Sequence, residues 1–576
     1  MRLRLNNSRL TYVIKTAYFG WGLGLLAFGA YLTWLWLPSR LPALSLLLLI
    51  GLGVGARVWL AQPTQVRHWL LVALKPEYLA LGAILVAATA LRLAGLAQSL
   101  PYLDNPDEPT TVQAAIKMLQ TGDLNPHFFR WPSLSFYSQF LISIPRFLAG
   151  VGAGDFTNLA NISDTNFYLW GRLLSAALGS ATVLVTYLIG RLLYNPATGL
   201  LAALILAVLP LHTEHSHYVT PDIMVTFWAT LTVLFAALIY KEGRPRWYWW
   251  AGLATGLTIG SKYNVGIVFL TVILAHFLTP AAQRGKFSWL ARSGLIALIV
   301  FLITTPFAIL DLSGFLDEIA FQVRHYTIVG HGTASDGASW SAYLQDFVDE
   351  AFVYQAAMVA VGGIGLALWR QRREDWLILA LPAVGYLFFA AAKVHFSRNL
   401  LPLLPPLAIL GAVFLLTTAS WASQKLKITK NSTVQSAIVV ILWLAFFGFA
   451  LQHSLLTDRY YLQPDTRTQA GAWVFKNVAA GAKLRLEHGA PLLPPERYQD
   501  VSAQRPIGGH DLDWYRQQGY NYLVASSYEY RPLMADDAQA NQNYQALFKQ
   551  GHLVAQFAGD SPDHPGPTIL IYKLDP

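Results

Sequence analysis

The stretch Phe167–Leu193 reads FYLWGRLLSAALGSATVLVTYLIGRLL, with Arg172 and Arg191 as its charged residues. A run of about 20 apolar residues is long enough to cross a bilayer as an α-helix. Comparable runs occur along most of the chain: Ala17–Leu37, Leu41–Ala61, Tyr78–Leu96, Val219–Tyr240, Gly294–Leu310 and Val434–Leu451. The sequence therefore predicts an α-helical polytopic membrane protein.

The composition supports this prediction. Of the 576 residues, 54% are hydrophobic and 13% are charged, whereas soluble domains carry roughly 25% charged residues. The net charge of +9 is interpreted as basic loops on the cytoplasmic side of a membrane, not as a nucleic-acid surface. Cysteine is absent, so any external domain must be stabilised by its own core without disulfides.

Basic and acidic segments alternate along the chain, which predicts the orientation of the spans. We place the basic clusters inside: Arg2/Arg4/Arg9/Lys15, Arg67/Lys75, Lys241/Arg244/Arg246, Arg284/Lys286/Arg292, Arg370/Arg372/Arg373 and Lys425/Lys427/Lys430. This assignment requires Pro132–Gly150 to lie flat at the outer interface or to be re-entrant. We then expect about 13 transmembrane helices in a multi-pass protein of the plasma (inner) membrane. Its N-terminus is predicted to be cytoplasmic, on a retained first span.

The predicted division is a transmembrane domain, residues 1–455, with large outer loops at 98–166 and 311–350, followed by a soluble extracytoplasmic α/β domain, residues 456–576. The tail alternates two kinds of segment. Its helix-like segments are Thr466–Asn477, Asp511–Gln518 and Asn541–Gln550, and its strand-like segments are Lys483–Glu487, Asn521–Ser526, Leu553–Phe557 and Thr568–Leu574.

The first outer loop contains an acidic segment, Asp104-Asn-Pro-Asp-Glu-Pro109. Acids crowded beside a bilayer raise one another's pKa, and they can bind a cation or act as a base. Asp107 and Glu108 are therefore candidate catalytic residues, and Asp104 is a candidate site-lining residue. The alternative is a solvated loop in which Asp107 caps the following helix.

Three basic residues are expected on the outer side, against the usual charge bias: Arg172, Lys262 and Arg398. Basic groups in this position require an anionic partner, and a lipid-linked phosphate is the natural one. The alternative for each is contact with ordinary lipid headgroups.

Other polar residues at the outer ends of spans are candidates to line the same site. Asp222 begins a span, and His212, His215 and His217 precede it in a pattern that invites a metal interpretation if the rings converge. His325 and His331 lie on the second outer loop, from which they could approach the acidic loop. A divalent metal ion is left open as a cofactor, with Asp107, Glu108 and His331 as its candidate ligands.

These segments, in this order, resemble the C-type membrane glycosyltransferases, most of all the protein O-mannosyltransferases and lipid A aminoarabinose transferases. The resemblance covers roughly residues 79–419. It rests on these residues: Asp107-Glu108, Thr121-Gly-Asp-Leu-Asn-Pro126, Trp131-Pro-Ser-Leu134, Arg172 in Gly171-Arg-Leu-Leu, Pro221-Asp222, Ser261-Lys262-Tyr263, and Arg398 before Leu401-Pro-Leu-Leu-Pro.

The resemblance implies transfer of a sugar from a polyprenyl-phosphate donor to an acceptor hydroxyl at the outer face of the membrane. It gives Asp107 the catalytic place and Glu108 that of its partner, and it assigns the donor phosphate to Lys262, Arg398 and Arg172. Inversion at the anomeric carbon is likewise implied by the family. The acceptor is left open among lipid, glycan and protein, and no nucleic-acid partner is expected.

One departure from the family and three alternatives bear on this interpretation. The aminoarabinose transferases carry an acidic-basic pair before the proline where this chain has Arg130-Trp131, which weakens the case for a metal there and for the same acceptor.

A lipid-linked glycan polymerase or ligase would use a similar donor. A transporter or flippase would place charges midway through its spans, and a scaffold would need none of the clustered charges.

Overall fold

A computed structural model describes residues 75–576 except 157, 160–161, 163–164, 331–338, 426–431, 562 and 575–576. The chain divides into two compact units, residues 1–87 and 88–576. Of the first unit, the described part is Lys75 and the opening of helix α4 (Pro76–Leu93). The predicted spans Ala17–Leu37 and Leu41–Ala61 lie outside the described residues.

Six helical segments among the described residues are long and apolar enough to cross a membrane: Pro76–Leu93, Asn166–Leu193, Pro221–Glu242, Phe287–Thr304, Ser397–Lys425 and Val434–Asn477. Three shorter apolar segments accompany them: Pro196–Val208, Tyr263–Leu278 and Gln355–Arg370. The chain is thus a polytopic membrane protein, as predicted. The total of about 13 spans stays a prediction.

The helices begin and end where the local sequence favours it. Proline is the first residue of α8 (Pro196–Val208), α9 (Pro210–His215), α10 (Pro221–Glu242) and α11 (Pro245–Ser261). A backbone N–H at this position has no intrahelical partner, so the helix loses no hydrogen bond when proline lacks one. Gly243 ends α10 with a φ of +62°, a backbone conformation that glycine adopts without strain.

The remaining elements of the membrane region follow in chain order. They are α5 (Glu108–Thr121), α6 (Leu134–Ala153), α7 (Asn166–Leu193), η2 (Tyr263–Val268), α12 (Phe269–Leu278), α13 (Phe287–Thr304), α14 (Phe307–Leu310), α15 (Leu312–Arg324), η3 (His325–Val329), α16 (Trp340–Asp346), η4 (Phe347–Ala351), α17 (Gln355–Arg370), α18 (Arg373–Ala390), η5 (Ser397–Leu403), α19 (Leu404–Lys425) and α20 (Ser432–Tyr461).

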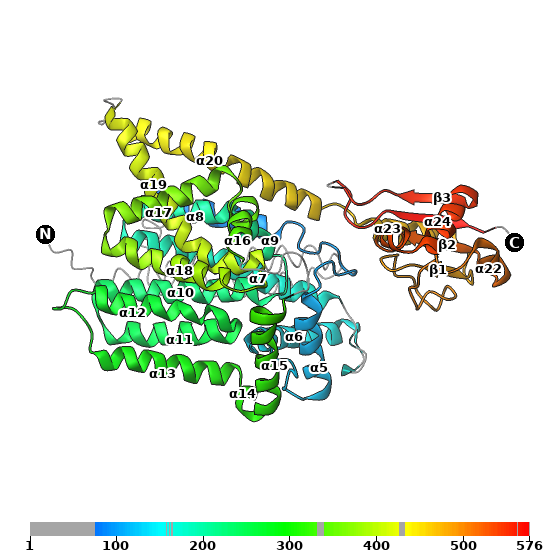
Figure 1. Cartoon of the computed structure of the whole chain (residues 1–576), viewed down its shortest axis with the longest axis horizontal. Coiled ribbons are helices and arrows are strands. Elements are labelled where there is room, and N and C mark those ends of the chain that lie inside the picture. Colours follow the sequence, from blue (N-terminus) through cyan, green and yellow to red (C-terminus); the bar gives the residue numbers. More distant parts are fainter. Residues whose placement is uncertain are drawn as a thin grey trace, which may run out of the picture. The chain divides into compact units, whose positions relative to one another are not determined.

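Close packing between α11 and α13, which lie side by side in Figure 1, depends on a stripe of small residues. A Cβ atom added to Gly252 would lie 2.4 Å from the carbonyl oxygen of Ser293, and one added to Gly256 would lie 2.7 Å from that of Ala297. Glycines spaced four residues apart let helix backbones approach within a membrane, where apolar side chains gain nothing by leaving lipid.

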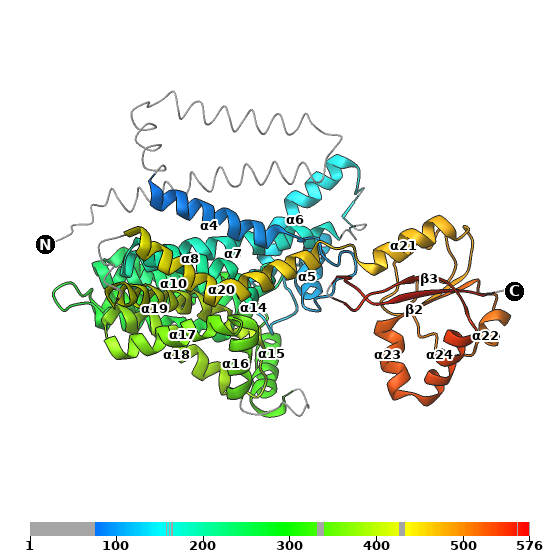
Figure 2. The ribbon, with the colours of Figure 1, turned by 90° about the horizontal axis from the view of Figure 1, so that it is seen from above.

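Helix α6 covers most of Pro132–Gly150, the segment predicted to lie flat or re-entrant, and it is not among the six candidate spans. Its outward face is apolar, with Leu141 63% and Leu148 62% exposed, while Gln139 and Arg146 are buried. This reversal of the usual pattern is what a lipid-facing surface favours. Figure 1 shows α5, α6 and α15 gathered at one end of α10, α11 and α13, and Figure 2 shows the same ribbon from above.

The tail contains a four-stranded sheet with the order β1-β2-β4-β3. Strand β1 pairs in parallel with β2, and β4 is antiparallel to both of its neighbours. The bounds are α21 (Thr466–Asn477), β1 (Leu484–Leu486), α22 (Leu512–Gln517), β2 (Tyr522–Ser526), α23 (Ser527–Asp536), α24 (Ala538–Gln550), β3 (His552–Phe557) and β4 (Ile569–Lys573). One buried cluster includes Val474, Leu484, Val524 and Ile571, so this mixed α/β fold has its own apolar core.

Candidate functional site

Four charged residues meet at one end of the helix bundle. Asp222 stands in the first turn of α10, and Lys262 follows the last residue of α11. Because α10 and α11 are consecutive and joined by a short turn at Gly243, the start of one lies beside the end of the other. Arg398 belongs to η5, which leads into α19, and Asp107 precedes α5.

The four side chains form a continuous network of opposite charges. The Arg398 guanidinium lies 3.1 Å from a carboxylate oxygen of Asp107 and 4.0 Å from one of Asp222. The Lys262 ammonium donates to Asp222 over 2.8 Å. The side chains of Asp107 and Arg398 are each 26% exposed, whereas that of Asp222 is 3% exposed. Asp107 and Arg398 are therefore the most accessible members, and the Lys262 side chain is 15% exposed.

Asp107 occupies the N-cap position of α5, but its side chain makes no capping hydrogen bond there. Its backbone N–H donates to the Asn105 side chain over 3.0 Å. The carboxylate points to Arg398 instead of the helix, so the capping alternative does not describe this residue.

Glu108 and Arg172 form a pair that is completely buried. Arg172 donates through Nε and one terminal nitrogen to the two carboxylate oxygens of Glu108, over 2.8 and 2.6 Å. The Glu108 carboxylate also accepts the N–H of Val219, and Arg172 donates to the carbonyls of Leu96 and Gln98. The hydrogen bonds of both side chains are satisfied within the protein, and the pair joins the first loop to α7. This arrangement favours a role in stabilising the fold. The catalytic role of Glu108 and the phosphate role of Arg172 stay predictions.

Two neutral residues belong to this network that the sequence pattern did not indicate. The Asn399 side-chain oxygen accepts from Lys262 over 2.9 Å, and its amide nitrogen donates to the Tyr343 hydroxyl over 2.7 Å. Burial raises the pKa of Tyr343, so its hydroxyl stays protonated near neutral pH. Asn399 follows Arg398 directly in the sequence, and this adjacency is the feature that could have identified Asn399 as part of the network.

Asp104 contacts the beginning of the tail instead of the charged network. Its carboxylate accepts from Arg467 over 2.7 Å, and Arg467 also pairs with Asp465 over 2.6 Å. The Arg467 guanidinium lies over the ring of Tyr102, 4.2 Å from its centre. The segment leading to Asp107 is thus held by Arg467, in the first turn of α21.

The histidines that drew attention in the sequence do not converge. His217 places its two ring nitrogens 2.9 and 3.0 Å from the carbonyl oxygens of Thr213 and Ala94, and His212 contacts Arg92. His325 stacks on Phe321, and His331 lies outside the described residues.

Among the residues that the structure describes, no group of three or more histidine, aspartate or glutamate side chains is arranged to hold a metal ion. The described part of the predicted ligand set does not fit one either, because both carboxylate oxygens of Glu108 are engaged by Arg172. A metal role for Asp107 together with His331 stays a prediction.

The two loops that were predicted to face outward are joined by residues other than the predicted histidines. The Asn125 amide donates to Asp311 over 2.9 Å, and Arg130 pairs with Glu318 over 2.9 Å. The Arg130 guanidinium also lies over the ring of Phe321, 4.4 Å from its centre. Arg130, at the position where the chain departs from the aminoarabinose transferases, therefore connects the first loop to α15.

Part of this bundle is similar to known glycosyltransferases. Residues 162–308 match the family described as dolichyl-phosphate-mannose-protein mannosyltransferase. The undecaprenyl phosphate-alpha-4-amino-4-deoxy-L-arabinose arabinosyl transferase of Pectobacterium carotovorum is 27% identical over 364 residues, covering 61% of this chain and 62% of the relative. The Pseudomonas fluorescens enzyme with the same name, numbered 1, is 26% identical over 320 residues, covering 53% of this chain and 54% of the relative.

A solved structure shares the fold. ArnT from Cupriavidus metallidurans in the apo state superposes with a TM-score of 0.50 at 13% sequence identity, covering 85% of this chain and 97% of that one. The chain therefore resembles the O-mannosyltransferases and aminoarabinose transferases, as the sequence motifs predicted. The matches span less than two thirds of the length of the curated relatives.

Proposed function

We propose that this chain is a membrane glycosyltransferase that moves a sugar from a polyprenyl-phosphate donor to an acceptor hydroxyl. The observation that carries the proposal is the network of Asp107, Arg398, Asp222 and Lys262 at one end of the bundle. It combines a reachable carboxylate with two cations, which are the groups that this reaction requires. Relatives named for transfer from undecaprenyl phosphate support that lipid as the donor carrier.

In the proposed reaction Arg398 and Lys262 stabilise the leaving phosphate. When the bond from the anomeric carbon to the phosphate oxygen breaks, negative charge grows on the phosphate, and positioned cations lower the energy of that state. Lys262 is held by Asp222 and Asn399, so its ammonium is oriented before the donor arrives. Arg398 contacts both carboxylates and is the group best placed to turn toward an incoming phosphate.

Asp107 is proposed as the base that takes the proton of the acceptor hydroxyl while the oxygen attacks the anomeric carbon. In this structure the contact with Arg398, 3.1 Å long, occupies the Asp107 carboxylate. Phosphate binding would draw Arg398 away and free Asp107 for the acceptor, which couples the two substrates. A base positioned in this way contributes about 10²–10⁴-fold to the rate.

Two other functional classes are less well supported. A transporter needs ionisable groups midway along its spans, whereas Asp107, Asp222 and Lys262 lie where their helices begin or end. A glycan polymerase or ligase would share the donor chemistry and differ in the acceptor. The acceptor of this chain is proposed as a hydroxyl on a lipid, a glycan or a protein.

We predict that replacing the proposed phosphate-binding cations weakens donor binding. A charge-assisted hydrogen bond contributes roughly 1.5–3 kcal/mol, so Lys262→Ala and Arg398→Ala should each weaken binding of the polyprenyl-phosphate sugar about ten- to a hundredfold. Direct binding of the donor to purified protein in detergent measures this effect.

Lys393→Ala is the matched control, because Lys393 donates to the carbonyl of Ile328 in a neighbouring segment. Parent-like donor binding by correctly folded Lys262→Ala and Arg398→Ala would refute the assignment. Equal weakening in all three variants would point to general electrostatic attraction instead.

We further propose that the tail, residues 456–576, forms an extracytoplasmic domain, with the Asp107 end of the bundle on the same side of the membrane. The supporting observations are the basic clusters at the opposite helix ends and the contact of Arg467 with Asp104. A reporter fused after Pro576 is expected to be active outside the cytoplasm. A cytoplasmic reporter would reverse the orientation and the placement of α6.

A further inference from the structure

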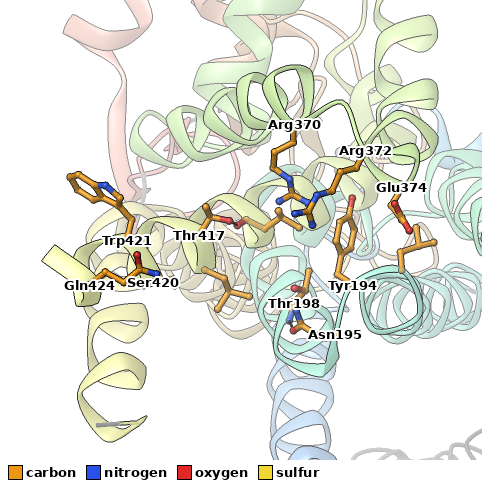
Figure 3. Close-up of a pocket in the computed structure, with 13 residues that line it drawn as sticks. Tyr194, Asn195, Thr198, Arg370, Arg372, Glu374, Thr417, Ser420, Trp421 and Gln424 are labelled. Atoms are coloured by element: carbon orange, nitrogen blue, oxygen red, sulfur yellow. Dashed lines mark hydrogen bonds between the residues drawn. The ribbon is translucent and has the colours of Figure 1, made fainter. Parts of the chain in front are cut away.

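A pocket lies at the end of the bundle opposite Asp107. It is enclosed by the junction of α7 and α8, the turn between α17 and α18, and the last turns of α19, and its volume is about 510 Å³ (Figure 3). Polar side chains dominate the wall, among them Tyr194, Thr198, Arg370, Arg372 and Thr417. None of the residues of the candidate functional site lines it.

The acidic groups of this pocket are already neutralised. Asp375, beneath it, lies 3.2 Å from Nε of Arg370 and accepts the Tyr194 hydroxyl over 2.7 Å. Glu374 pairs with Lys241 over 3.2 Å and accepts the Tyr240 hydroxyl.

Arg372 supplies positive charge that no described acidic residue balances through an ion pair. It is exposed, and Figure 3 shows it directed into the pocket beside Arg370. An arginine in this setting binds phosphate oxygens well, because its N–H groups form a planar fork. The pocket is therefore suited to bind an anionic group. A phosphate would match the positive charge of Arg372 and the polar side chains of the wall.

The position of the pocket identifies the source of the phosphate. Helix α19 starts directly after the Arg398 segment, and its residues from Val413 to Gln424 line the pocket. At 1.5 Å per residue these residues lie about 14 to 30 Å from the start of the helix. The far end of that range is close to the roughly 30 Å of the hydrocarbon core. Trp421, on the pocket wall, is 60% exposed, and tryptophan concentrates at the level of lipid headgroups.

We propose that this pocket binds the headgroup of an anionic phospholipid from the leaflet opposite the candidate functional site. Arg372 would contact the phosphate, the polar wall would take the headgroup hydroxyls, and Trp421 would lie beside the glycerol region. The inference does not depend on the proposed transfer reaction, since it rests on residues at the other end of the helices.

The test measures lipid binding to the full chain in neutral detergent by native mass spectrometry. Phosphatidylglycerol is expected to remain bound where phosphatidylcholine does not. Arg372→Ala should weaken phosphatidylglycerol binding about tenfold, the effect of losing one charge-assisted contact. Gln424→Glu, which adds a negative charge on the pocket wall, should weaken it as well.

Arg373→Ala is the matched control, because Arg373 donates to the carbonyl of Leu278 and does not line the pocket. Equal binding of the two lipids, or equal losses in the Arg372 and Arg373 variants, would overturn the proposal. Inorganic phosphate and glycerol 3-phosphate form a separate arm. If either displaces phosphatidylglycerol at comparable concentration, the site takes a soluble phosphate compound and the lipid assignment is wrong.

Discussion

Asp107→Asn is expected to lower the rate of sugar transfer by about 10²–10⁴-fold, the usual contribution of a positioned base, while donor binding survives. The substitution preserves the shape of the side chain and removes its basicity. The carboxylate is 26% exposed and contacts Arg398, so the variant should fold normally. Single-turnover transfer measured with donor at saturation separates the chemical step from binding.

Asp104→Asn is the matched control for this prediction. It lies on the same loop, but its carboxylate pairs with Arg467 and not with Arg398. We expect a smaller loss of transfer from this variant than from Asp107→Asn. If Asp104→Asn abolishes transfer and Asp107→Asn does not, the catalytic carboxylate has been misassigned.

The second large effect is expected from the buried pair of Glu108 and Arg172. Arg172→Met should destabilise the protein by about 3–5 kcal/mol, because it leaves the Glu108 carboxylate buried without its cation. The midpoint of thermal unfolding in detergent, compared with the parent protein, measures this loss. A phosphate ligand would behave differently, since its removal would weaken donor binding and leave stability nearly unchanged.

Two further variants make the comparison specific. The double variant Arg172→Met/Glu108→Gln removes both charges and should recover part of the lost stability. Arg130→Ala breaks a more exposed ion pair, with Glu318, and should cost no more than about 1 kcal/mol. If Arg172→Met is as stable as the parent protein but binds the donor weakly, the structural role is wrong and Arg172 binds the donor phosphate.

Much of the secondary structure was predictable from local sequence. Apolar runs gave α7 and α10 to within a few residues, and α21 begins and ends where the tail pattern predicted, at Thr466 and Asn477. Helix α23 (Ser527–Asp536) was missed, since it is polar and contains Pro532. It packs beside the sheet and α24, so contacts distant in sequence stabilise what local preference does not.

The sequence predicted the charged residues of the candidate site, but it did not predict which of them pair with one another. Lys262 and Arg398 were identified because positive charge on that side of a membrane is unusual. The sequence assigned Asp107 and its partner Glu108 to one catalytic pair, yet one faces Arg398 and the other is buried against Arg172. Side chains of successive residues at a helix start point in different directions, and partners 64 residues apart leave no local signal.

The most direct test of the proposed function is release of undecaprenyl phosphate. Purified protein in detergent would be mixed with lipid-linked sugars and acceptors extracted from membranes, and free undecaprenyl phosphate would be followed by mass spectrometry. We predict time-dependent release by the parent protein and a rate at least about 10²-fold lower in Asp107→Asn. Release at the same rate by both proteins, or by neither with every extract, would contradict the proposed transfer at Asp107.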